Sequence, residues 1–357
     1  MVKLLIKAVL ILTGAVAALL VLVLMILSVS EYRPQPEEQI ALTGEDVHKT
    51  VRDGDEITML TFNIGYGGLD KDMDFFMDGG RRNTPESKEK VEENLTGIAE
   101  IVAEQDADVI FLQEVDRDSK RSYYINEADM LAEALGGVQM FAQNYRCLYV
   151  PWPLSDAVGQ VNSGLMTLSG LEVRDAGRIA LPVSFCWPVR LCQLKRCLLV
   201  TRIPVEGSGR ELVLFNLHLE AYDDGDGQEK QTEVLFELMK QEYEKGNYVV
   251  AAGDFNQVFP EDDFTAYPLK SSRYYEPGRL EKDMLTEGWT FASDISTPTC
   301  RLLNEAYHPH RSWSTQYYVI DGYILSPNVV LEEVCTLDEG FEYADHNPVR
   351  ISVRLGG

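Results

Sequence analysis

The sequence predicts an α/β (α+β) fold behind one N-terminal transmembrane helix, and three observations support this prediction. Residues 8–29 form a run of about 22 residues without a charge, which is long enough to cross a bilayer as a helix. Residues 91–105 carry apolar side chains at helical spacing and lie between two strand-like segments, 57–65 and 107–116. Further strand-like segments follow towards the C-terminus, and most of them end in polar side chains.

The composition is that of a folded and strongly acidic protein. Of the 357 residues, 45% are hydrophobic. The chain contains 57 Asp and Glu residues but only 32 Lys and Arg residues, so the formal net charge is −25. No repeat or linker-like tract interrupts the chain after residue 55, and we expect one domain over residues 56–357. A protein that holds duplex nucleic acid needs a basic face. The net charge therefore disfavours nucleic acid as a partner, although a local basic rim could survive within the acidic average.

Residues 1–30 are predicted to be a membrane anchor. The apolar run is longer than the core of a signal peptide, and residues 28–30 are only a weak cleavage signal, but a cleaved signal peptide stays open as the alternative. Lys3 and Lys7 precede the run, and acidic residues follow it. The positive-inside rule therefore predicts a single-pass protein of the cell membrane, with a cytoplasmic N-terminus and an extracytoplasmic domain.

Residues 31–55 are expected to form an extended juxtamembrane tether, because they contain Pro34, Pro36 and many acidic residues. Outside the cytoplasm cysteines can form disulfides, and we expect buried thiols or one or two bridges. The six cysteines are Cys147, Cys186, Cys192, Cys197, Cys300 and Cys335. The spacing of Cys192 and Cys197 has no matching second pair, which disfavours a zinc site.

Polar side chains stand at the ends of the strand-like segments. Taken singly, each fits an ordinary loop or turn. Together they fit a site that is built from many strand ends at one edge of packed sheets. The segments are 57–65 with Asn63, 107–116 with Glu114, 211–221 with His218, 248–257 with Asp254 and Asn256, 316–326 with Asp321, and 341–355 with Asp345 and His346. Residues 231–246, between two of these strands, are predicted to be an amphipathic helix.

These residue types suit the hydrolysis of a phosphoester, which needs an aligned water and stabilisation of the phosphoryl and leaving oxygens. Hard oxygen ligands bind Mg²⁺, and Glu114 is the expected principal ligand, with Asn63 sharing the site through its amide oxygen. A histidine that a carboxylate holds is expected to act as a general base or as a cationic phosphate clamp. His346 fits this role, with Asp345 or Asp321 as its partner.

The remaining polar residues have expected roles in handling water and phosphate. Asp254 would orient the attacking water or take its proton. Asn256 and His218 would donate hydrogen bonds to phosphoryl oxygens, and Asn162 is a further candidate for substrate contact. His308 and His310 flank a proline in a loop and fit substrate contact better than metal binding. No Gly-x-Ser-x-Gly elbow, Walker loop or His-Glu-x-x-His helix occurs in the sequence, which weakens the rival hydrolase classes.

The order of the motifs resembles that of the endonuclease/exonuclease/phosphatase superfamily. The resemblance covers about residues 57–355, and LQE, GDFN and a late DH in this order are jointly specific. The matching positions are Asn63 in TFNIG, Glu114 in LQEVD, His218 in FNLHLE, Asp254 and Asn256 in GDFN, Asp321 in VIDGYI, and Asp345 and His346 in ADHNPV. The resemblance implies a DNase-I-like four-layer sandwich of two β-sheets flanked by helices, with the site at one end of the sheets.

The resemblance also implies Mg²⁺, or Mn²⁺ in its place, and a set of roles. Glu114 and Asn63 would serve the metal, and His346 with Asp345 would form an acid/base pair. The other implied roles are the nucleophilic water for Asp254 and the phosphate for His218 and Asn256. The chain departs from the family pattern at residues 162–170, which lack the Arg and Pro that often follow the Ser, so a phosphate contact there stays open.

A long polar and aromatic loop within residues 63–95 is a second departure, and we expect it to overhang the site and help to select the substrate. Phe75, Phe76 and Met77 in this loop could dip into a membrane interface or could pack the loop down.

These observations predict a monomeric metal-dependent phosphoesterase that hydrolyses a phosphodiester or phosphomonoester. A lipid headgroup or a small molecule is favoured over duplex DNA. A surface-anchored nuclease is the first alternative, and a Lys or Arg cluster along one rim of the site would favour it. A noncatalytic binding module on the same fold is the second, and the retention of the expected polar positions argues against it.

Overall fold

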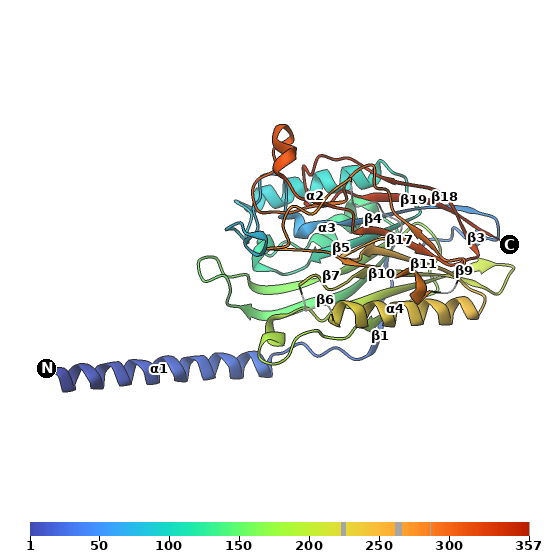
Figure 1. Cartoon of the computed structure of the whole chain (residues 1–357). Coiled ribbons are helices and arrows are strands. Elements are labelled where there is room, and N and C mark those ends of the chain that lie inside the picture. The colour runs from blue at the N-terminus through green and yellow to red at the C-terminus, as the bar shows by residue number, and fades with distance from the viewer. Residues whose placement is uncertain (223–225, 261–265, 286, 357) are drawn as a thin grey trace.

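The computed structural model describes residues 1–222, 226–260, 266–285 and 287–356. Two large β-sheets pack face to face, and helices cover their outer faces (Figure 1). The predicted four-layer sandwich, preceded by one apolar N-terminal helix, is therefore confirmed.

We name the two sheets after their central parallel pairs. The β10–β11 sheet contains, in spatial order, β1 (Glu37–Ile40), β8 (Asp175–Ala180), β9 (Cys197–Glu206), β10 (Glu211–His218), β11 (Tyr248–Asp254), β17 (Asp321–Leu325) and β14 (Thr290–Ala292), with β3 (Val51–Arg52) added beside β9. The β4–β5 sheet contains β18 (Val329–Thr336), β19 (Val349–Leu355), β4 (Glu56–Asn63), β5 (Val109–Asp116), β7 (Gly159–Ser169), β6 (Val138–Val150) and β2 (Thr43–Gly44). Two short ladders join β12 (Gln257–Val258) to β13 (Gly278–Arg279), and β15 (Cys300–Arg301) to β16 (Tyr317–Tyr318).

Four α-helices and several short 3-10 helices complete the described fold. The α-helices are α1 (Val2–Val29), α2 (Lys88–Ala103), α3 (Glu127–Leu135) and α4 (Asp226–Glu244). The 3-10 helices are η1 (Gly65–Gly67), η2 (Phe76–Asp78), η3 (Lys120–Ser122), η4 (Val189–Cys192), η5 (Lys282–Met284) and η6 (Pro309–Ser314). The Ser87 side chain accepts a hydrogen bond from the backbone N–H of Lys90 and so caps the N-terminus of α2.

Apolar side chains on both faces of the central strands hold the layers together. Phe111 of β5 and Val250 of β11 lie in the core between the two sheets. Phe236 of α4 belongs to the cluster on the outer face of the β10–β11 sheet, and Leu95 of α2 to the cluster on the outer face of the β4–β5 sheet. Burial on both faces explains why the central strands are nearly continuous apolar runs in the sequence.

The strand directions place the polar strand ends together. β4 runs parallel to β5, and β10 runs parallel to β11, so each pair ends at the same edge of its sheet. The register pairs His218 with Asp254, and Asp254 in turn with Asp321 of the antiparallel β17. Three of the predicted site residues are therefore neighbours across the strands.

A buried polar bridge joins the two sheets beneath this edge. The Asn216 side chain of β10 donates hydrogen bonds to the carbonyl oxygens of Met166 (2.9 Å) and Leu112 (3.3 Å) in the other sheet. Its oxygen accepts a hydrogen bond from Gln113 Nε2 at 2.8 Å. Gln113 directly precedes Glu114, so this bridge fixes the spacing of the sheets next to the site.

The segment 31–55 differs from the unpacked tether that the sequence predicted. β1 pairs with β8, β2 pairs with β6, and β3 pairs with β9, so this segment adds short edge strands to both sheets. An extended chain that passes a free sheet edge can satisfy the unpaired backbone N–H and C=O groups there. The prediction of an extended backbone holds for these strands, and the prediction of a free tether is wrong for residues 37–52.

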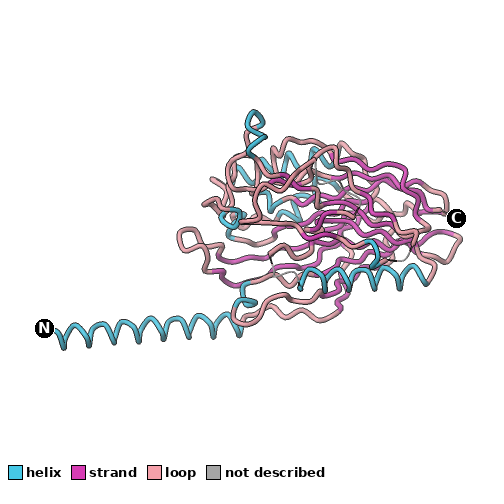
Figure 2. The backbone as a smooth tube through the Cα atoms, in the orientation of Figure 1, coloured by secondary structure: helices cyan, strands magenta, loops and turns pink. Residues whose placement is uncertain are grey.

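α1 confirms the predicted N-terminal helix and projects from one end of the molecule (Figures 1 and 2). Among the described residues, it is the one helix that is long and apolar enough to cross a membrane. Leu27 in its last turn is buried in a cluster with Tyr145 and Leu191. Glu31, just beyond the helix, forms an ion pair with Lys195 at 3.4 Å.

All six cysteines are free thiols in the structure, so of the two expected alternatives, buried thiols or one or two bridges, the bridges are not found. Cys147, Cys197 and Cys300 are buried.

Replacing Asn216 with Leu should lower the free energy of unfolding by about 2–3 kcal/mol, because it removes the buried hydrogen bonds between the sheets and leaves their partners unsatisfied, with the same number of side-chain heavy atoms. Urea denaturation of the purified chain would measure the change. Asn304→Leu, at an exposed position, is the matched control and should change the free energy little. Equal stability of the two variants would contradict a structural role for this bridge.

Candidate active site

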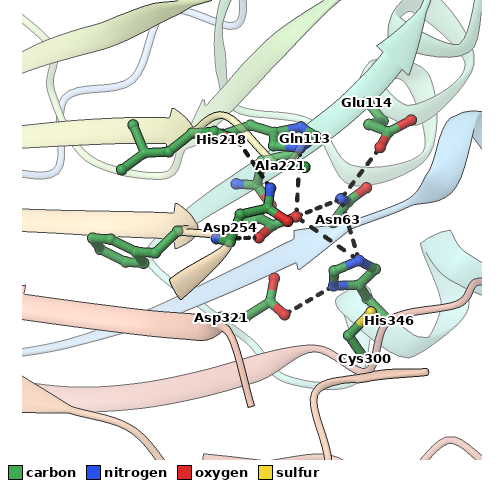
Figure 3. Close-up of polar contacts among 12 residues, drawn as sticks. Asn63, Gln113, Glu114, His218, Ala221, Asp254, Cys300, Asp321 and His346 are labelled. Atoms are coloured by element: carbon green, nitrogen blue, oxygen red, sulfur yellow. Dashed lines mark hydrogen bonds and ion pairs between the residues drawn. The ribbon is translucent and has the colours of Figure 1, made fainter. Parts of the chain in front are cut away.

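Most of the predicted site residues line one cleft of about 1030 Å³ at the edge where the central strands end. Asp321 lies directly behind His346, to which it is hydrogen bonded. Figure 3 shows Asn63, Asp254 and Asp321, from β4, β11 and β17, converging with His346, which lies in the segment before β19. The predicted residues that line the cleft are Asn63, Glu114, His218, Asp254, Asn256, Asp345 and His346.

Asn63 stands at the centre of the site. Its amide nitrogen lies 3.1 Å from Asp254 Oδ2, 3.5 Å from Glu114 Oε1 and 3.5 Å from His346 Nε2. Its amide oxygen accepts the backbone N–H of Gly65 at 3.1 Å, and because that N–H can only donate, the orientation of the amide is fixed. The NH₂ group, rather than the oxygen, therefore faces the carboxylates. In this arrangement Asn63 organises the acidic side chains, and its role as a metal ligand stays a prediction.

His346 is held by Asp321. His346 Nδ1 donates to Asp321 Oδ2 at 2.8 Å, and Nε2 lies 3.8 Å from Asp254 Oδ2. Burial by itself would lower the pKa of His346, but the Asp321 carboxylate outweighs burial and raises this pKa well above its ordinary value. The implied hydrogen-bonded pair of His346 with Asp345 is wrong, because Nδ1 of the imidazole is bonded to Asp321 instead.

Asp254 is the shared carboxylate of the site. Asp254 Oδ1 accepts the backbone N–H of Asn256 at 2.9 Å, and Oδ2 lies 3.5 Å from His218 Nε2. Burial and the charge of Asp321, partly offset by His346, raise the pKa of Asp254 to about 7. A carboxyl group with this pKa can exchange a proton with water at neutral pH, as the predicted role requires.

His218 is a buried and neutral histidine. Burial lowers its pKa well below the ordinary value, and the positive charges of Arg196 and His346 reinforce the effect. Its Nδ1 has no hydrogen-bond partner among the described residues. The role of His218 as a phosphate donor stays a prediction.

Asn256 supports the site through both ends of its amide. Its nitrogen donates to the carbonyl oxygen of Leu219 at 2.9 Å, and its oxygen accepts the hydroxyl of Tyr275 at 2.8 Å. One amide hydrogen is left for a phosphoryl oxygen, because the NH₂ group carries two donors.

Two site residues adopt the left-handed backbone conformation that residues other than glycine rarely adopt. Glu114 has a φ of 56°, and Asn256 has a φ of 52°. Glu114 sits in an irregularity of the β5–β7 pairing, between Leu112 and Val115. Such bulges redirect a side chain. Strained backbone that persists at a cleft is typical of residues with a functional role.

Glu114 and Asp345 are the carboxylates that best fit a divalent cation. Asp345 Oδ1 is buried without a hydrogen-bond partner among the described residues. Burial, partly offset by His346 and reinforced by the Glu114 carboxylate, raises the pKa of Asp345 to about 7. A divalent cation beside both carboxylates would remove their repulsion and give the free oxygen a partner.

Two buried groups in the described part of the chain bring metal-binding atoms within 4.8 Å of one another. One contains Cys300, Asp345 and His346, and the other contains Asp254, Asp321 and His346. Ion pairing with His346 already accounts for the second group. Asp345 in the first group is the acid that is left for a cation, because its Oδ1 has no hydrogen-bond partner among the described residues.

Asn162 is not part of the catalytic cleft. Neighbouring residues of a strand point to opposite faces, and it is Ser163 that lines the cleft. Asn162 Oδ1 accepts a hydrogen bond from Gln143 Nε2 at 2.5 Å, and the residue lines a separate pocket with Glu31 and Arg146. The predicted contact of Asn162 with substrate is wrong for this cleft.

Other cleft residues were not found from the sequence. Cys300 lies beside His346, and burial raises the pKa of its thiol to about 12, so the thiol is neutral (Figure 3). Asp78 accepts hydrogen bonds from the Leu303 N–H at 2.9 Å and from the Tyr222 hydroxyl at 3.1 Å. None of these residues belongs to a strand-end motif, so only their contacts in the fold reveal them.

The cations of the cleft are paired with acceptors. Arg121 makes two hydrogen bonds to Asp116, at 2.9 and 3.0 Å, and Arg196 lies 3.4 Å from Glu220. Both arginines are buried. These two arginines therefore hold neighbouring carboxylates in position and do not form an exposed basic rim.

The long loop after β4 borders the cleft, as predicted. Phe75, Phe76, Met77 and Asp78 are among its lining residues, and Phe76 also joins the cluster that surrounds Leu27 of α1. Its role in substrate selection stays a prediction.

Asp345→Asn and Glu114→Gln should each weaken Mn²⁺ binding by at least about tenfold, because each removes one charge from the proposed site. Isothermal titration calorimetry with Mn²⁺ measures this without any substrate. Asp78→Asn is the matched control, since the hydrogen bonds of Asp78 already occupy its carboxylate. An equal loss of affinity in the control would place the cation elsewhere.

The sequence profile of the Endonuclease/Exonuclease/phosphatase family matches residues 60–331 of this chain. No curated protein sequence matches the chain.

Solved structures show the same fold at low identity. An endonuclease/exonuclease/phosphatase from Beutenbergia cavernae DSM 12333 has a TM-score of 0.58 at 18% identity, over 85% of this chain and 72% of that one. ANGEL2, described as a 2',3'-cyclic phosphatase, has a TM-score of 0.53 at 15% identity, over 89% and 99% of the two chains. A humanized D. rerio TDP2 has a TM-score of 0.50 at 16% identity, over 84% and 99%. The profile covers most of the chain, and the chain therefore belongs to the endonuclease/exonuclease/phosphatase family, whose members hydrolyse phosphoester bonds.

Proposed function

We propose that this chain is a membrane-anchored phosphoesterase that depends on Mg²⁺ or Mn²⁺ and acts outside the cytoplasmic membrane. The observation that carries the proposal is the convergence of three elements in one cleft. They are the Asp321–His346 pair, the carboxyl group of Asp254, and the electrostatically coupled carboxylates Glu114 and Asp345.

The site residues divide the chemistry of phosphoester hydrolysis among them. His346, kept cationic by Asp321, would bind a phosphoryl oxygen or protonate the leaving oxygen. Asp254 would take a proton from the attacking water, since its pKa of about 7 allows both protonation states near neutrality. Glu114 and Asp345 would hold the cation, which supplies charge neutralisation of the phosphoryl group when bound.

The cleft supports a substrate with a lipid headgroup or a small phosphoester rather than duplex DNA. Its basic residues, such as Arg121 and Arg196, are buried and paired, and apolar side chains form much of the remaining lining. Duplex binding needs exposed cations that displace counterions from many phosphates. The net charge of −25 points the same way.

The proposed topology rests on α1 and on its flanking charges. Lys3 and Lys7 would stay in the cytoplasm, and the catalytic domain would lie on the other side of the membrane. We propose a monomer with residues 1–30 as the anchor and residues 56–357 as the catalytic domain.

The direct test is a hydrolysis assay of the full-length chain in detergent, with a panel of phospholipids, nucleotides and DNA. Phosphate or headgroup release would be measured with Mg²⁺, with Mn²⁺ and with a chelator. We expect metal-dependent turnover of a lipid or small phosphoester, and His346→Ala should lose at least about 10²-fold in kcat. A folded chain that turns over no substrate with any metal would favour the noncatalytic alternative, and preferred cleavage of DNA would favour the nuclease.

A second variant tests the role of Asp321 as the residue that positions His346. Asp321→Asn should lower kcat by about 10²-fold or more and leave KM and Mn²⁺ affinity nearly unchanged, because the charge that holds the imidazolium is lost. Asp294→Asn is the control, since Asp294 accepts the Thr336 N–H at 2.8 Å and does not line the cleft. An unchanged kcat in Asp321→Asn would contradict this role.

A further inference from the structure

We propose that α1 is itself part of the substrate-binding site. Its last three turns form one wall of an apolar groove that leads a membrane lipid with a phosphorylated headgroup from the bilayer to the catalytic residues. This inference rests on the proposed function and narrows its substrate class to bilayer lipids.

The catalytic residues and the anchor line one continuous cleft. The same cavity that contains His346 and Glu114 extends to α1. The lining residues of α1 are Leu19, Leu20, Val23, Leu24 and Leu27. Their spacing of three and four residues places them on one face of the helix, so the opposite face stays free for the surrounding lipid.

The opposite wall of the groove is also apolar and comes from loops of the catalytic domain. Trp152 and Val158 belong to the hairpin that connects β6 and β7, whereas Phe185 precedes η4 and Val189 is its first residue. Trp152 is 58% exposed and Val189 is 53% exposed although both line the cleft. Large apolar side chains that stay exposed together mark a surface for an apolar partner.

The rim around the groove continues this apolar surface at the end of the molecule from which α1 projects. Leu154 at the hairpin tip is 83% exposed, and Trp187 is 55% exposed. The indole N–H of Trp187 donates to Ser28 Oγ at 3.1 Å, so this loop is tied to the end of α1. Tryptophan prefers the boundary between headgroups and hydrocarbon. Figure 1 shows the β6–β7 hairpin on the same side of the body as α1.

The length of α1 sets the depth of the groove. A bilayer core of about 30 Å takes about 20 helical residues, so a core that begins after Lys7 ends near Leu27. Leu19 and Leu20 would then lie about 10 Å inside the outer leaflet, at the level of acyl chains. A lipid phosphate at the boundary would enter the cleft while its chains stay beside α1.

The two ends of the cavity define the chemistry of the occupant. The α1 end is lined mainly by apolar side chains, whereas the catalytic end offers the polar side chains of His346 and Asn256 and the proposed metal site. A nucleotide would leave the apolar end empty, and an apolar peptide would leave the charged end without a partner. A molecule with a phosphorylated head and an apolar tail fits both ends.

The test uses the full-length chain in phosphatidylcholine vesicles with Mn²⁺ and a soluble chromogenic phosphodiester as substrate. Inhibition by hexadecyl phosphate and by butyl phosphate is compared in Leu20→Trp and Val21→Trp. Leu20 lines the groove, whereas Val21 is absent from its lining and is similarly exposed. Leu20→Trp should raise the inhibition constant of hexadecyl phosphate by at least about tenfold, because the indole fills the space of the chain. The inhibition constant of butyl phosphate should stay unchanged in Leu20→Trp. In Val21→Trp the inhibition constants of both compounds should stay unchanged.

A second pair of variants probes the opposite wall. Trp152→Ala should weaken inhibition by hexadecyl phosphate, and Leu154→Ala, on the same hairpin but outside the lining, should not. If the inhibition constant of hexadecyl phosphate were equal for the two variants of each pair, the proposed groove would be wrong. Turnover of the soluble substrate by the same variants would still support the phosphoesterase activity. A wild-type chain that turns over no phosphoester would instead overturn the proposed function, and the lipid substrate with it.

Discussion

The site depends on how the two sheets are held against each other. Its residues come from both sheets, so a small slip between the sheets would separate Asn63 and Glu114 from Asp254 and His218. The hydrogen bonds of Asn216 and Gln113 oppose such a slip, because they join the sheets directly beneath the site. Apolar packing alone tolerates sliding better than a buried polar pair with fixed geometry does.

The pKa values of the site residues follow from the burial of several acidic side chains close to one another. Burial raises the pKa of both Asp254 and Asp345 to about 7, whereas Asp321 makes His346 more basic. The imidazolium of His346, held by Asp321, thus provides a positive charge on its Nε2 side. The acids near Glu114 provide negative charge that suits a cation. The positive and negative charges are separated by a few side chains. Within the catalytic part of the cleft, one side therefore suits a phosphoryl oxygen and the other side suits a metal ion.

The N-terminal region has a larger structural role than a passive tether. Residues 37–52 add strands to both sheets, and Leu27 and Glu31 fasten the end of α1 to the catalytic domain. These contacts fix the direction in which the cleft faces relative to α1. In a membrane, a site fixed in this way would face the bilayer from which the chain emerges.

The sequence by itself determined the fold class, the anchor helix and most of the site residues, because continuous apolar runs and strand-end motifs are local patterns. It also placed Glu114, His218, Asp254 and His346 in one site. Only the tertiary structure decided that Asp321 rather than Asp345 holds His346, that the Asn63 amide presents its nitrogen, and that Asn162 faces another pocket. Those outcomes depend on which side chains from distant parts of the chain meet one another, and composition and spacing do not determine such contacts. The continuity of the cleft with α1 depends in turn on packing between segments that are far apart in the chain.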